Sequence, residues 1–110
     1  MIYVFLDTIE RQMARIRQRV ASGGHDVPVS KVSERRFRSF AQLAWFARHV
    51  DKLFAFDNSG GEPELSVAKV YGPMWLLRPI PVEMRKALAT ASPDVREWFD
   101  KPLPFEPPER

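Results

Sequence analysis

The stretch IYVFLDTIER, residues 2–11, indicates the fold of the chain. Its first five residues are apolar and mostly β-forming, which is typical of a buried strand, and we expect this strand to be central in a parallel sheet. Asp7 follows, and Glu10 stands three residues later, which is the spacing of a capping box with Asp7 as the N-cap. The stretch therefore predicts a strand that leads directly into a helix, as in an α/β fold.

The helix predicted after this strand has an apolar face and an arginine face. Its apolar residues recur at intervals of four, three and four, and we expect them to pack on the sheet: Ile9, Met13, Ile16 and Val20. Arginines recur every four residues on another face: Arg11, Arg15 and Arg19. The sequence Ser22-Gly23-Gly24 is predicted to end the helix, because glycine takes the left-handed conformation at little cost.

A second helix is predicted from about residue 28 to residue 49. Pro28 suits its first turn, where a backbone N–H is not needed. Its apolar surface comes from six residues: Val32, Phe37, Phe40, Leu43, Ala44 and Ala47. Cationic residues crowd its first half: Lys31, Arg35, Arg36 and Arg38.

The next segments predict a hairpin. KLFAF (52–56) and LSVAKVYG (65–72) are typical of strands, and DNSGGEPE between them is rich in turn-forming residues. After residue 72 the chain becomes apolar but is broken by prolines. We therefore divide the chain into residues 1–72 and a C-terminal extension, residues 73–110.

The C-terminal extension differs in character from the rest of the chain. PMWLLRPIP (73–81) predicts an extended segment lying on the body, and a helix is expected over residues 82–91. Pro93 predicts the start of a last short helix that runs through Phe99. The proline-rich end KPLPFEPPER is expected to be extended or disordered.

Composition excludes several classes of protein. The chain has 110 residues and no cysteine, which argues for one domain or a piece of one without a disulfide framework or a thiolate metal site. It has no apolar run long enough for a membrane span, and its start does not resemble a signal peptide. We therefore expect a cytoplasmic protein that does not contact a membrane.

The order of strand, helix, glycine hinge, arginine-rich helix and strand carries a specific resemblance. VFLDT, RIRQRVASGGHDVP, RRFRSF and FDNSG together resemble the C-terminal part of zeta-toxin-like P-loop kinases, over about residues 2–70. GGHDVP followed by RRF is the most distinctive part. The resemblance implies a partial P-loop kinase-like fold from an ATP-dependent kinase that works with Mg²⁺. Toxin members of the family phosphorylate UDP-N-acetylglucosamine.

The resemblance also implies roles for individual residues. Residues 8–49 correspond to the lid that closes over the phosphates, and four arginines match its arginine-rich positions and are the candidates for phosphate binding: Arg19, Arg35, Arg36 and Arg38. One or two of them are expected to reach the transferred phosphate, and the resemblance does not choose among the four. Fixed guanidinium groups stabilise the charge that phosphoryl transfer spreads over the phosphate oxygens. Four residues correspond to the hinge of the lid: Gly23, Gly24, His25 and Pro28. The alternative for the arginines is a solvated helical face, and His25 contacts either the hinge backbone or a ligand.

Asp57 and Asn58 are candidates for a loop near the nucleotide base, with simple turn formation as the alternative. The chain departs from the family in two respects, because it has no GxxxxGKS or GxxxxGKT sequence and it lacks the upstream strand that carries the general base in the family. We therefore expect no catalytic residue and no metal site in this chain, and no activity from it alone. Its expected partner is the missing N-terminal half or a second copy.

The alternative function is a non-catalytic interaction or nucleic-acid-binding module. Clustered arginines attract phosphate backbones in general. Nucleic acid is the less favoured partner, because the net charge is only +3 and no standard nucleic-acid-binding motif is present.

Overall fold

Five strands form one mixed sheet, in the order in which they occur along the chain. The computed structural model describes residues 1–25, 27–92, 94–103 and 105. Its elements are β1 (Ile2–Phe5), α1 (Ile9–Ala21), α2 (Val29–His49), β2 (Lys52–Asp57), β3 (Glu64–Val70), β4 (Met74–Leu76), α3 (Val82–Ala91) and β5 (Val95–Glu97). The predicted α/β class is confirmed.

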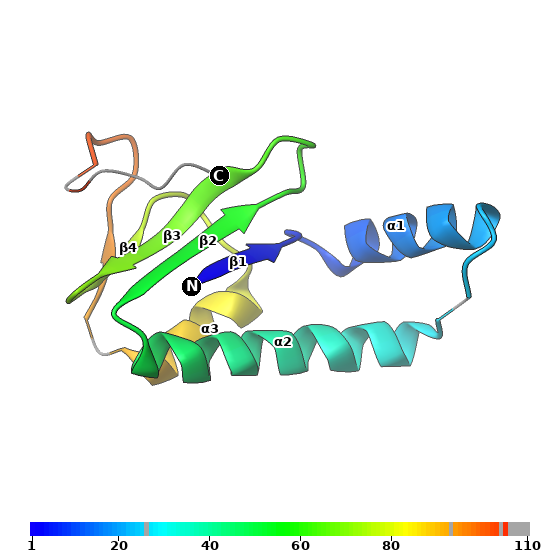
Figure 1. Cartoon of the computed structure of the whole chain (residues 1–110), viewed down its shortest axis with the longest axis horizontal. Helices are drawn as coiled ribbons and strands as arrows, with labels where there is room; N and C mark the ends of the chain where they lie inside the picture. The colour runs from blue at the N-terminus through cyan, green and yellow to red at the C-terminus, as the bar shows by residue number, and fades with distance from the viewer. Residues whose placement is uncertain (26, 93, 104, 106–110) are drawn as a thin grey trace.

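Two parallel strand pairs place the helices on one face of the sheet. β1 pairs in parallel with β2, and the connection between them holds α1 and α2. β4 pairs in parallel with β5, and their connection holds α3. Both crossovers step in the same direction across the sheet, so right-handed connections put their helices on the same side. As a result, α2 and α3 lie side by side under the sheet (Figure 1).

The core lies between this helix pair and the facing side chains of the sheet. The sheet contributes Phe5, Leu53, Ala55, Val67, Met74 and Leu76, and the helices contribute Phe40, Leu43, Ala47, Met84 and Leu88. Strand side chains alternate between faces, so Leu53 and Ala55 point to the helices while Phe54 points to the opposite face. There, Phe54 lies 6.3 Å from the Phe105 ring, between ring centroids.

Described residues after residue 72 belong to the same sheet and core as the segments before it. β4 and β5, both after residue 72, continue the sheet from β3. The rings of Trp75 on β4 and Trp98 meet edge to face, with centroids 5.1 Å apart. Part of the proline-broken segment 73–81 is therefore a strand. Met74 and Leu76 of this strand are buried and Trp75 is half-buried, and this burial stabilises it.

The hairpin of β2 and β3 and the helix over residues 82–91 are confirmed. The predicted helix from Pro93 to Phe99 is wrong, because Val95–Glu97 pairs with β4 as β5. Pro93 itself, residue 104 and residues 106–110 lie outside the described residues, and so does most of the predicted extended or disordered end. No helix in the described part is both long and apolar enough to cross a membrane.

β1 is an edge strand, so the prediction of a central strand is wrong. It pairs on one side with β2, and the five-stranded sheet ends there. Tyr3 and Phe5 face α2 and the core, whereas Ile2 and Val4 are exposed. A continuous apolar run predicts burial on both faces, but it does not reveal how many neighbours a strand has.

The start and packing of α1 also differ from the prediction. Its N-cap is Thr8, whose side chain accepts a hydrogen bond from the Arg11 N–H, and not Asp7. The helix runs beyond the end of the sheet and lies alongside the first half of α2 (Figure 1). Its apolar face therefore packs on α2, with Ile16 buried, because the sheet does not extend that far.

The molecule thus has two regions. We call α1 and residues 29–38 of α2 the arm. We call the sheet, residues 39–49 of α2 and α3 the body. The arm projects from one end of the body (Figure 1), and the principal extents of 44, 26 and 20 Å reflect this elongated shape.

Candidate functional site

A cavity of about 280 Å³ lies between the two helices of the arm. Its lining contains three arginines and no carboxylate: Leu6, Gln12, Arg15, Ile16, Arg19, Val32 and Arg35. Ile16 and Val32 are buried and form its apolar part. The polar residues of the lining are therefore three arginines and one glutamine.

Helix geometry explains why these arginines meet. Arg15 and Arg19 are four residues apart on α1, so they lie one turn apart on the same face. Arg35 is on α2, which lies alongside α1. The arginine face predicted from the sequence thus opposes one arginine of the second helix, and the cavity lies between them.

Most of this charge is not neutralised within the described residues. Arg15 Nη2 donates to the Asn58 carbonyl oxygen at 2.7 Å. Arg19 and Arg35 are exposed, and neither side chain has a hydrogen bond or ion pair with any described residue. Like charges that line one cavity repel one another, so an anion bound there would lower the electrostatic energy.

Arg36 has a different role, although it is the immediate neighbour of Arg35. Its side chain is only 7% exposed, and Nη1 donates to the Leu6 carbonyl oxygen at 2.8 Å and to Gln12 Oε1 at 3.0 Å. Nη2 donates to the Asp7 carbonyl oxygen at 3.0 Å. Arg36 therefore ties α2 to the connection between β1 and α1, and it does not line the arm cavity.

Arg38, the last of the four predicted phosphate-binding arginines, also lies outside the cavity. Its Nη2 is 3.6 Å from Glu34 Oε1, in an exposed ion pair one turn apart on α2. The structure therefore brings together Arg19 and Arg35 but not Arg36 and Arg38. It adds Arg15 to the residues that line the cavity. The four-residue spacing of the arginines in α1 had already placed Arg15 on the same helix face as Arg19.

The predicted hinge glycines form a helix C-terminal cap. The Gly23 N–H donates to the Val20 carbonyl oxygen at 3.0 Å, and the Gly24 N–H donates to the Arg19 carbonyl oxygen at 2.7 Å. This is the Schellman pattern, and Gly23 takes the positive φ of 100° that it requires. The prediction that these glycines end the first helix is confirmed.

The other two predicted hinge residues lie on either side of Asp26, which is outside the described residues. His25 is exposed and has no hydrogen bond to a described residue. The glycine N–H groups, and not the imidazole, therefore hold this turn. Pro28 is the N-cap of α2, and its carbonyl oxygen accepts from the Val32 N–H at 3.2 Å.

The loop of Asp57 and Asn58 lies at the carboxyl end of β2, beside the carboxyl end of β1. Asp57 Oδ1 accepts a hydrogen bond from the Ser59 N–H at 2.8 Å, as in an Asx turn. The Asn58 N–H donates to the Phe5 carbonyl oxygen at 3.0 Å. The turn-forming alternative accounts for Asp57, whereas Asn58 also lines a second cavity.

This second cavity, of about 190 Å³, adjoins the first and shares Leu6, Gln12 and Arg15 with it. Its polar lining includes the hydroxyl groups of Tyr3 and Ser39, whose oxygens are 2.5 Å apart. Burial is the largest effect on Tyr3 and raises the pKa of its phenol, while the hydrogen bond with Ser39 opposes the shift. Tyr3 is therefore a neutral hydrogen-bonding group in this cavity.

No group of three or more His, Cys, Asp or Glu residues in the described part could hold a metal ion. Guanidinium groups fit phosphate, and no carboxylate that would suit Mg²⁺ lines either cavity. Comparisons with protein-family models, with curated proteins and with solved structures found no match.

Proposed function

We propose that this protein binds a phosphate-bearing ligand in the arm cavity, through Arg15, Arg19 and Arg35. The observation that carries the proposal is that three arginine side chains, from two helices, line one cavity that no carboxylate lines. Planar guanidinium groups bind phosphate oxygens with two parallel hydrogen bonds. A solvated helical face would not need arginines from two helices to line the same cavity.

The position of the cavity in the fold supports the same proposal. β1 and β2 are parallel, so their carboxyl ends lie at the same edge of the sheet, next to the cavity. In open α/β sheets, ligands bind outside the carboxyl ends of the strands. The adjoining second cavity offers hydroxyl and amide groups from Tyr3, Ser39 and Asn58. These groups suit the part of the ligand that carries the phosphate.

The resemblance to zeta-toxin-like kinases gives the proposal its finer form. The protein is then the arginine-bearing C-terminal portion of an ATP-dependent kinase, and its arm is the lid. ATP with Mg²⁺, when bound to the nucleotide-binding part of such a kinase, supplies the phosphoryl group. The arginines of this chain bind the phosphate oxygens and hold them in place. Because the sequence has no GxxxxGKS or GxxxxGKT, this chain alone should not turn over ATP.

Isothermal titration of the chain with pyrophosphate and with ATP tests the proposal. Arg19→Ala and Arg35→Ala should each weaken binding by about tenfold or more, because each removes a charged hydrogen-bond donor from the ligand. Two matched controls remove the same charge outside the cavity: Arg17→Ala on α1 and Arg38→Ala on α2. These controls should change the dissociation constant by about twofold or less, since exposed charges are screened.

Equal losses in all four variants would contradict the site, because binding would then depend on net charge alone. Tighter binding of an oligonucleotide than of ATP, with equal losses in all four variants, would instead favour a nucleic-acid-binding module. No binding of either phosphate ligand to the folded chain would overturn the proposal.

A further inference from the structure

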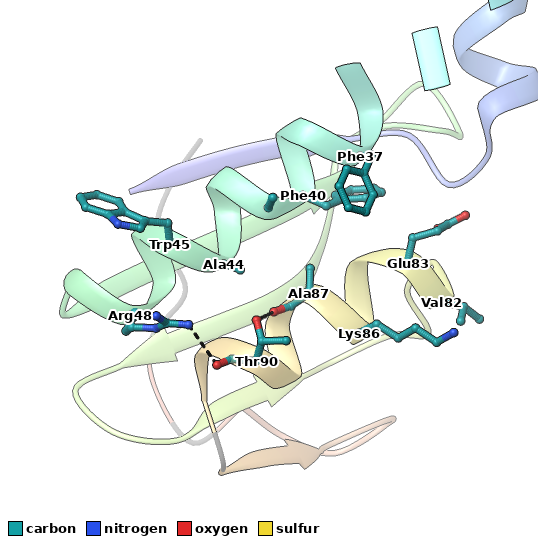
Figure 2. A pocket seen from close by; sticks show the side chains of 11 residues that line it. Phe37, Phe40, Ala44, Trp45, Arg48, Val82, Glu83, Lys86, Ala87 and Thr90 are labelled. Carbon is teal, nitrogen blue, oxygen red and sulfur yellow. Dashed lines mark hydrogen bonds between the residues drawn. The ribbon is translucent and has the colours of Figure 1, made fainter. Parts of the chain in front are cut away.

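A third cavity adjoins the buried residues Phe40 and Ala44 of α2, and none of Arg15, Arg19 and Arg35 lines it. It is an apolar groove of about 570 Å³ between α2 and α3. We call the three alanines that line it its floor: Ala41, Ala44 and Ala87. Phe37, Trp45 and Val82 stand at its margins (Figure 2). We call it the α2–α3 groove.

The residues at the margins are unusually exposed for their type. Phe37 is 76% exposed, Trp45 is 55% exposed and Val82 is 66% exposed. Single exposed apolar residues are common on protein surfaces, but a cluster of them around an apolar hollow marks an interaction surface. The sequence predicted Phe37 as part of the buried surface of α2, and the structure corrects this. Phe37 is one residue beyond the buried Arg36 and therefore points to another side of the helix.

Trp45 is held in place before any partner binds. Its ring stacks on the His49 ring at a centroid distance of 4.2 Å and meets the Phe46 ring edge-on at 5.1 Å. The His49 Nδ1 atom lies 2.8 Å from the Trp45 carbonyl oxygen, which fixes the imidazole under the indole. A side chain that is already ordered loses less conformational entropy when it is buried in an interface.

Charged side chains lie at both ends of the groove: Arg48 at one end, and Glu83 with Lys86 at the other (Figure 2). Glu83 lies at the end where Phe37 stands, and Arg48 lies at the end where Trp45 stands (Figure 2). Glu83 is 62% exposed and has one long ion pair, at 3.9 Å, with Arg36. Arg48 Nη2 donates to the Thr90 carbonyl oxygen at 3.1 Å and is otherwise exposed. Lys86 extends along α3 toward Val82, at the same end as Glu83 (Figure 2). Its side chain points away from α2, whereas Glu83 points toward the Phe37 end of that helix (Figure 2).

From this arrangement we propose that a second copy of the chain occupies the α2–α3 groove, in a two-fold symmetric dimer with antiparallel α2 helices. A two-fold axis near the alanine floor brings the Phe37 end of one copy against the Trp45 end of its partner. Glu83 of each copy then faces the partner's Arg48, so opposite charges meet twice. The small alanines of the floor leave room for an aromatic side chain of the other copy. Such a surface is self-complementary, as a two-fold interface requires.

Sedimentation equilibrium of the full chain tests whether it dimerises, and Ala41→Glu tests the face. Ala41 is exposed on the groove floor, so a carboxylate there should weaken the dimer about tenfold or more. Gln42→Glu is the matched control, since Gln42 is the next exposed residue of α2 and does not line the groove. It should leave the dimer unchanged. Thermal melting of both variants checks that they remain folded.

A charge exchange tests the antiparallel orientation. Arg48→Glu alone and Glu83→Arg alone should each dimerise more weakly than the parent chain, because like charges then meet at both ends. An equimolar mixture of the two variants should associate more tightly than either alone, because every contact then joins opposite charges. A folded parent chain that stays monomeric at every concentration, or equal weakening by Ala41→Glu and Gln42→Glu, would overturn the proposal. A mixture no tighter than its components would overturn the antiparallel arrangement.

Discussion

In the body, side chains of the sheet, α2 and α3 bury one another almost completely, whereas in the arm α1 and α2 enclose a cavity. Leu53, Met74 and Met84 of the body have no exposed surface. In the described part of the arm, Ile16 and Val32 are the buried apolar residues, and both line the arginine cavity. Apolar packing stabilises the body, but it contributes much less to holding the arm.

The arm is joined to the body by α2, which is one continuous helix through both regions, and by arginine hydrogen bonds. Arg36 donates to the Leu6 and Asp7 carbonyl oxygens, and Arg15 donates to the Asn58 carbonyl oxygen. Regions with few buried apolar contacts open at lower free energy than a packed core. We therefore expect the arm to open at a lower free energy than the body.

The largest effect on stability should come from truncating a buried side chain of the same size to alanine in each region. Leu43→Ala in the body should lower the free energy of unfolding by about 4 kcal/mol, because Leu43 is enclosed by the core. Ile16→Ala in the arm should cost about 2 kcal/mol, because Ile16 already borders a cavity. Urea denaturation measures both values. A larger loss for Ile16→Ala would contradict the distinction between the two regions.

The next effect concerns the link between arm and body. Arg36→Met keeps an apolar side chain of similar length but removes the donors for two backbone carbonyl oxygens and for Gln12. We expect a loss of about 2–3 kcal/mol in the free energy of unfolding, since partly buried acceptors are left unpaired. Arg38→Met, at an exposed position on the same helix, is the control and should change stability little. Equal losses of stability in the two variants would show that the hydrogen bonds of Arg36 contribute nothing beyond what an exposed arginine of the same helix contributes.

A smaller effect should be confined to the arm. In Gly24→Ala, the added Cβ would lie 2.9 Å from the Arg19 carbonyl oxygen, so the cap must shift. We expect a cost of about 1 kcal/mol and faster hydrogen exchange at the end of α1, with the sheet amides unchanged. Gly60→Ala is the control, because no atom lies within 4 Å of its added Cβ. Faster exchange throughout the sheet would mean that arm and body unfold as one unit.

The smallest effect is a pH dependence. Burial raises the pKa of Tyr3 above its ordinary value of 10.0, so the folded state holds this proton more tightly than the unfolded state. Stability should therefore fall as the pH rises above about 10, and Tyr3→Phe should reduce that slope. Melting temperatures measured between neutral and alkaline pH, with Tyr71→Phe at an exposed tyrosine as the control, test this. An unchanged slope in Tyr3→Phe would contradict the shift.

Much of the candidate site was predictable from residue spacing within one helix. Arg15 and Arg19 are four residues apart, and this spacing placed both on one face of α1. Gly23 predicted the glycine cap at the end of that helix. The sequence did not distinguish Arg35 from Arg36, because adjacent residues on a helix point about 100° apart and only the packing of α2 decides which one is buried. Asp7 was expected as the N-cap, but Thr8 caps α1, since both residue types suit that position.

The sequence by itself determined the local elements: the apolar strand, the two arginine-bearing helices, the hairpin and the glycine end of α1. These depend on periodicity and on backbone preferences within a few residues. Only the tertiary structure decided that β1 is an edge strand, that β5 replaces a predicted helix, and that Arg36 is buried while Arg19 and Arg35 share a cavity. Each of these features depends on which residues, distant in sequence, become neighbours in the fold. The burial of a side chain and the pairing of a strand are set by those neighbours and not by the segment itself.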